Sequence, residues 1–114
     1  MSDLDLIATG LAALSRQVAE TWRAEDYPPD VRSDFAQFRH ALTHVHKAAG
    51  KLAAHVDHVE HARADRAVLD AAGEVPKLLA DLVHCAAKMA KVQNVDLAAA
   101  YVVRASELAA RRGH

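Results

Sequence analysis

Residues 35–59 read FAQFRHALTHVHKAAGKLAAHVDHV and contain the strongest periodic signal in this chain. Apolar side chains recur there at alternating steps of three and four residues: Phe35, Phe38, Leu42, Val45, Ala49, Leu52, Val56 and Val59. Such spacing forms one apolar stripe along an α-helix, repeated at heptad intervals. The pattern predicts a long helix that begins near Asp30 or Ser33, both suitable N-cap residues. Gly50 weakens a helix interior, so its presence suggests close approach by another helix or a ligand.

Three further helices are expected outside this stretch. They cover about residues 3–25, residues 76–93, and a last segment that runs from a cap at Asn94 or Asp96 to about Arg112. Residues 61–73 are expected to form a loop and a short helical turn. Since the chain is rich in Ala and has few aromatic residues, it is typical of helical proteins. The sequence predicts one all-α domain over residues 1–114, a four-helix up-and-down bundle completed by assembly into a homodimer or homotetramer.

Composition excludes several classes of protein. The chain has 14 basic and 15 acidic residues and a formal charge of −1, which gives no electrostatic footprint for duplex nucleic acid. The single cysteine, Cys85, permits neither an internal disulfide nor a multi-cysteine zinc site, and its apolar surroundings predict a buried thiol. No apolar run is long enough to span a bilayer, and the first residues lack the basic start of a signal peptide. A soluble, cytoplasmic protein is therefore expected.

A second stripe lies about opposite the apolar one on the long helix. Histidines and lysines follow one another there at steps of three and four: His40, His44, Lys47, Lys51, His55 and His58. Three interpretations stay open. The stripe can be a solvated polar face, or a transition-metal site built from one of its histidine pairs. It can also be an anion-facing pocket in which His44, Lys47 and Lys51 meet a phosphate or carboxylate group.

Three short segments resemble, in order and spacing, the MazG-like all-α nucleotide pyrophosphohydrolases. They are KAAGKLA at 47–53, LLADLV at 78–83 and NVDL at 94–97, followed by Arg104 and Arg111. The similarity covers about Phe38 to Arg112, which is most of the chain. It implies a four-helix protomer that assembles into a dimer or tetramer. It also implies hydrolysis of a nucleoside triphosphate to the monophosphate and pyrophosphate, with Mg²⁺ held by acidic residues.

Most of the acidic residues that this reaction needs are missing. In the register of the resemblance, four of the family's acids are replaced by Lys47, Ala48, Lys51 and Leu78, and only Asp81 is retained. Because no Asp or Glu lies between Phe35 and Val56, no shift of register restores a carboxylate cluster in this helix. Mg²⁺ requires oxygen ligands, and lysines in these places would repel it. Asp81 could instead form an ion pair with one of the lysines.

We therefore expect a MazG-like protein that has lost the Mg²⁺-dependent reaction and binds a ligand or a partner. Lysines in place of acids turn a metal-bridged phosphate site into a directly cationic one, suited to a nucleotide or another phosphorylated molecule. The candidate ligand-binding residues are His44, Lys47, Lys51, Asp81 and His84, and no catalytic residue, metal ligand or cofactor is assigned. Two alternatives remain. One is an unrelated helical interaction module, and the other is an active pyrophosphohydrolase that uses Mg²⁺ with Asp57, Glu60, Glu74 and Asp81.

Overall fold

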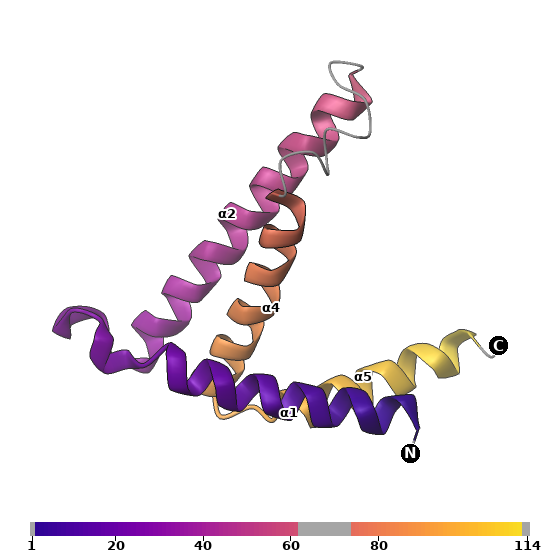
Figure 1. The fold of residues 1–114 in the computed structure, drawn as a ribbon, viewed down its shortest axis with the longest axis horizontal. Coiled ribbons are helices and arrows are strands. Elements are labelled where there is room, and N and C mark those ends of the chain that lie inside the picture. Colours follow the sequence, from indigo (N-terminus) through magenta and orange to yellow (C-terminus); the bar gives the residue numbers. More distant parts are fainter. Residues whose placement is uncertain (1, 62–73, 113–114) are drawn as a thin grey trace.

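The computed structural model describes residues 2–61 and 74–112 as helices joined by turns (Figure 1). Four α-helices run over Asp3–Thr21 (α1), Asp34–Glu60 (α2), Glu74–Val92 (α4) and Leu97–Arg112 (α5). Two single 3₁₀ turns, Ala24–Asp26 and Pro29–Val31, lie between α1 and α2. No strand occurs in the two described ranges, which confirms the all-α prediction for them. The turn expected within 62–73 lies outside the described residues.

Side-chain caps explain most of the helix boundaries. The Ser33 hydroxyl accepts an N–H from the first turn of α2 at 3.1 Å, and Ser2 caps α1 through a reciprocal capping box. Asp96 accepts an N–H from the first turn of α5 at 3.0 Å. Asn94, the other cap expected there, instead adopts a φ of 55° and ends α4 in the left-handed conformation that Asn tolerates. The first helix is shorter than expected and ends at Thr21.

The four helices form two antiparallel pairs that meet at an angle (Figure 1). Helix α2 packs along α4, α1 packs along α5, and α1 also crosses the C-terminal part of α4. Helices α1 and α2 contact each other only weakly, because the turns around Pro28 and Pro29 redirect the chain between them. This arrangement corrects the expected topology: the helices do not run up and down around one common axis.

Packing covers only part of the heptad stripe of α2. One half of the stripe is half-buried, namely Phe38, Val45, Leu52 and Val59. The other half is exposed: Phe35, Leu42, Ala49 and Val56. Small residues occupy the closest contacts between the helices, since Ala41, Ala48 and Ala87 are each at most 4% exposed. A single chain therefore buries only part of the apolar heptad stripe of α2.

The chain is more extended than a compact domain of its length. Its radius of gyration is 17.1 Å, whereas a compact chain of 114 residues has about 13 Å. The two helix pairs meet at an open angle, which accounts for the difference (Figure 1), and large apolar side chains such as Phe35 and Val103 are exposed. None of the helices in the described ranges combines the length and apolar character that a membrane-spanning segment needs.

Gly50 does not mark a close contact, contrary to the expectation. It is exposed in the middle of α2, and a Cβ added to it would meet no neighbouring atom within 4 Å. Because Ala is favoured over Gly in a helix interior, we expect Gly50→Ala to stabilise the chain by about 0.5–1 kcal/mol, measured by thermal unfolding. Gly10→Ala in α1 has equally open surroundings and is the matched comparison. A lower melting temperature for Gly50→Ala alone would contradict this reading.

Candidate functional site

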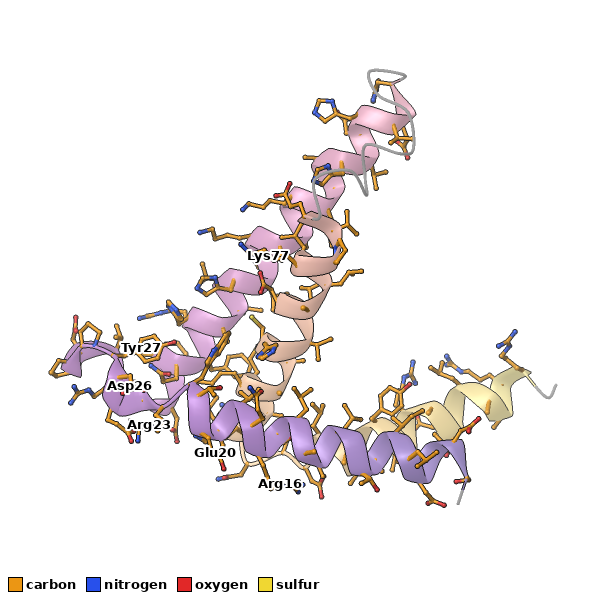
Figure 2. The ribbon with its side chains drawn as sticks, in the orientation of Figure 1. Arg16, Glu20, Arg23, Asp26, Tyr27 and Lys77 are labelled. Carbon is orange, nitrogen blue, oxygen red and sulfur yellow. The ribbon has the colours of Figure 1, made fainter. Side chains whose placement is uncertain are left out.

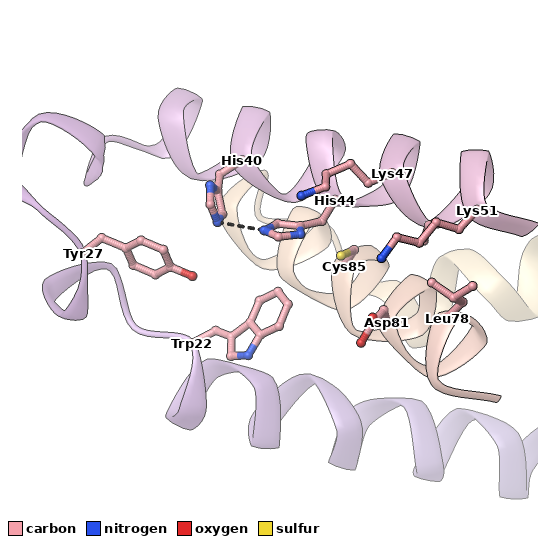
Figure 3. Close-up of a pocket in the computed structure, with 10 residues that line it drawn as sticks. Trp22, Tyr27, His40, His44, Lys47, Lys51, Leu78, Asp81 and Cys85 are labelled. Carbon is pink, nitrogen blue, oxygen red and sulfur yellow. Dashed lines mark hydrogen bonds between the residues drawn. The ribbon is translucent and has the colours of Figure 1, made fainter. Parts of the chain in front are cut away.

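A pocket of about 470 Å³ opens on one side of the α2–α4 hairpin (Figure 3). The two helices form its walls, and the end of α1 with the turn that follows closes it on a third side. Its lining residues are Trp22, Tyr27, His40, His44, Lys47, Ala48, Lys51, Leu78, Asp81 and Cys85. The pocket is thus made by three segments that lie far apart in the sequence.

Four of the five candidate ligand-binding residues line this pocket. His44, Lys47 and Lys51 project from successive turns of α2, and Asp81 lies on the facing side of α4 (Figure 3). All four side chains belong to exposed residues. The ion pair considered for Asp81 is not formed in the described ranges, because neither lysine ammonium lies within 4.0 Å of its carboxylate. Both ammonium groups are therefore available to a ligand.

His84, the fifth candidate, occupies a different position. It is absent from the pocket lining, and its ring centroid lies 5.8 Å from that of Trp22. Its Nδ1 atom is buried and has no hydrogen-bond partner among the described residues. The structure places His84 outside the lining and in ring contact with Trp22, an aromatic side chain of the pocket.

His40 and His44 form a hydrogen-bonded pair inside the pocket. Their Nε2 atoms are 3.2 Å apart, so one ring donates and the other accepts (Figure 3). The Tyr27 ring also meets the His40 ring in an edge-to-face contact, with ring centroids 5.4 Å apart. Partial burial lowers the pKa of His40, and the nearby His44 and Lys88 lower it further. The sequence placed His40 in the basic stripe, but His40 was not predicted to bind the ligand. Its spacing of four residues from His44, which puts both on one helix face, could have indicated this role.

The aromatic side of the pocket was not predicted from the sequence. Trp22 is the C-cap of α1, and Tyr27 follows the first 3₁₀ turn (Figures 2 and 3). The Arg32 guanidinium holds this segment in place by donating to the carbonyl oxygens of Tyr27, at 2.6 Å, and of Glu25, at 3.2 Å. Trp22 and Tyr27 therefore give the pocket a fixed wall that can accept a flat or apolar group.

Lys88 is a buried cation that joins α4 to the end of α1. Its side chain is almost inaccessible, at 2% exposed, and its ammonium donates to the carbonyl oxygen of Trp22. Lys91, one turn further along α4, donates to another carbonyl of α1 at 3.5 Å. Since α1 has no basic residue in its own last turn, these lysines supply the positive charge that a helix C-terminus favours. Burial lowers the pKa of Lys88, and the charge of Lys91 adds to this effect.

Cys85 lies at the floor of the pocket and is 1% exposed, which confirms the predicted buried thiol. Burial raises the pKa of this thiol, and the negative charge of Asp81 raises it further. Because the thiolate is the reactive form, Cys85 is a poor nucleophile in this position.

The acidic residues considered for a metal-dependent reaction do not converge. Glu74 stands at the first turn of α4 and is hydrogen-bonded to His55 at 3.0 Å, whereas Asp81 lies in the pocket two turns away. Nowhere in 2–61 and 74–112 do three His, Cys, Asp or Glu side chains lie close enough together to hold a metal ion. The residues described therefore do not fit Mg²⁺, which needs several oxygen ligands.

Comparison with protein-family models, with curated proteins and with solved structures returned no match for this chain. Its function is therefore inferred from the chemistry of the pocket.

Proposed function

We propose that this chain binds a phosphorylated ligand in the pocket between α2 and α4, on a MazG-like frame that has lost Mg²⁺-dependent hydrolysis. The observation that supports this most is the balance of charges around one cavity. His44, Lys47 and Lys51 line it, whereas Asp81 is the single carboxylate among the described residues of the lining. Ammonium and imidazole groups donate charge-assisted hydrogen bonds to phosphate oxygens, so the pocket can hold a phosphate without a metal.

The aromatic wall supports a ligand that has more than a phosphate group. Trp22 and Tyr27 stand across the pocket from the lysines, and the cavity is within the size range of sites for small molecules (Figure 3). Aromatic side chains stack on flat rings, including nucleotide bases. A nucleotide, with its phosphate at Lys47 and Lys51 and its base at the wall, is one ligand of this class.

Two measurements distinguish the binding protein from an active enzyme. Pyrophosphate release from a panel of nucleoside triphosphates, with Mg²⁺ or Mn²⁺ and an EDTA control, is expected to show no turnover. Binding of a nucleotide in EDTA is expected to change the fluorescence of Trp22, the single tryptophan, which lines the pocket. Metal-dependent turnover together with no binding in EDTA would overturn the proposal.

Asp81→Asn gives opposite results for the two functions. For a metal-free anion site, removing this carboxylate from the lining is expected to strengthen nucleotide binding about twofold to fivefold, since one repulsive charge disappears. For an active MazG-like pyrophosphohydrolase that uses Asp57, Glu60, Glu74 and Asp81, the same change removes a metal ligand and abolishes turnover.

We also infer that two copies of the chain associate through the exposed side of the α2–α4 hairpin. This face comprises Phe35, Leu42, Val56, Leu79 and Val83, which are 38–71% exposed. At 100° per residue, Leu79 and Val83 point away from Asp81, so the face lies opposite the pocket. Antiparallel pairing of two α2 helices would set Phe35 against Val56 and Leu42 against Ala49, each time a larger side chain against a smaller one.

We expect the protein to sediment as a dimer or a larger homo-oligomer at micromolar concentration. Leu42→Glu combined with Val83→Glu places charges in the middle of the proposed face and is expected to give monomers of unchanged helix content. Leu108→Glu, at an exposed apolar position of α5, is the matched control. A wild-type chain that stays monomeric at this concentration contradicts the inference, and association only with a different protein would favour the interaction module.

A further inference from the structure

We infer that the pocket takes its ligand through a doubly charged phosphate monoester, and that the His40–His44 pair gains one proton as the ligand binds. This inference rests on the proposed function and names the charge state of the group that the pocket recognises. It follows from the count of charges around the cavity and from the geometry of the two imidazoles.

Without a ligand, the net positive charge of the pocket lining is one less than the charge needed to balance a dianion. Lys47 and Lys51 contribute two positive charges, Asp81 removes one, and the buried thiol of Cys85 stays protonated. With both histidines neutral, the described residues of the lining therefore balance a single negative charge. One more proton on the lining raises its net charge to two positive charges. This balances a phosphate monoester, which carries two negative charges above its second pKa of about 6.

The histidine pair can accept that proton without losing its hydrogen bond. In the neutral pair one Nε2–H donates to the other Nε2, across 3.2 Å, and the donating ring keeps an unprotonated Nδ1. A proton added at this Nδ1 makes the donor an imidazolium and strengthens the bond. A second added proton would set two N–H donors against each other, so the pair takes up one proton and resists another.

Titratable groups from every neighbouring element lie around this pair. Lys47 and Lys51 follow it on α2, Asp81 and Lys88 lie on α4, and the Tyr27 phenol belongs to the segment after α1. Partial burial, the neighbouring His44 and the Lys88 charge lower the pKa of His40, and they therefore favour the uncharged ring in the pocket without a ligand. A bound dianion has the opposite charge to Lys88, so it raises the pKa of the histidine pair. The pair therefore takes up a proton when the dianion binds.

Phenyl phosphate and phenyl sulfate test the inference, because they are similar in shape but carry two negative charges and one. Binding is measured by Trp22 fluorescence between about pH 7 and pH 8.5, where the phosphate ester is already dianionic. Uptake of one proton predicts that the affinity for phenyl phosphate falls roughly threefold to tenfold per pH unit. The affinity for phenyl sulfate is expected to change much less over the same range.

His44→Gln is the decisive variant, since the amide keeps a hydrogen-bonding group but cannot take up a proton. It is expected to flatten the pH dependence of phenyl phosphate binding, whereas His46→Gln, at an exposed position outside the lining, leaves it unchanged. Binding of phenyl phosphate with the same slight pH dependence as the sulfate overturns this inference and leaves the proposed function intact. Failure of both esters to bind at any pH overturns the proposed function as well.

Discussion

Replacing Lys47 and Lys51 together by Met is expected to weaken nucleotide or phosphate-ester binding by roughly 30- to 100-fold. Both ammonium groups line the same cavity, and neither has an ion pair with Asp81. A bound phosphate would thus lose two charge-assisted donors at once, whereas the Asp81 carboxylate, which repels it, would stay in the lining. Met retains the apolar stem of Lys, so that the packing along α2 changes little.

Trp22 fluorescence in the presence of EDTA gives this affinity directly. Lys77→Met is the matched control, because Lys77 is an exposed lysine of α4 outside the pocket lining (Figure 2). Its substitution is expected to leave binding within twofold of the wild type. If the double variant binds as tightly as the control, the cationic stripe of α2 is a solvated face and the pocket has another role.

Lys88→Ala is expected to lower the free energy of unfolding by about 2–4 kcal/mol. The side chain is 2% exposed, so truncation removes a packed stem and leaves a cavity between α4 and α1. The same change removes the donor to the Trp22 carbonyl, an acceptor at the end of α1. Since Trp22 and its neighbours close the pocket, the loss should also change the Trp22 emission of the folded protein.

Urea unfolding followed by circular dichroism and by Trp22 fluorescence measures this effect. Lys91→Ala is the matched control, since Lys91 also donates to a carbonyl of α1 but is exposed, and a change below about 0.5 kcal/mol is expected for it. Lys88→Met retains the stem and is expected to fall between the wild type and Lys88→Ala. Equal stability of Lys88→Ala and Lys91→Ala would show that the buried lysine does not fix the end of α1.

Local sequence was sufficient for the helices and for the cationic side of the site. The boundaries of α2 and α5 follow from the caps at Ser33 and Asp96, which act within one turn of the chain. His44, Lys47 and Lys51 reach one cavity because residues three and four apart share a face of a helix. Asp81 was expected to face them and does line the same cavity, although the resemblance that suggested it remains a proposal.

The aromatic wall, the buried lysine and the open angle between the helix pairs could not be read from periodicity. Trp22 fits the apolar stripe of α1 and gives no sign of a binding surface, and Lys88 looks like any surface lysine of an amphipathic helix. Both acquire their roles where α1 crosses α4, and that crossing is set by turns and by contacts between residues more than sixty positions apart. Spacing along the chain specifies which side chains share a helix face, because the helix repeat is local; which faces meet depends on long-range packing, and that packing alone places the two aromatic rings opposite the lysines.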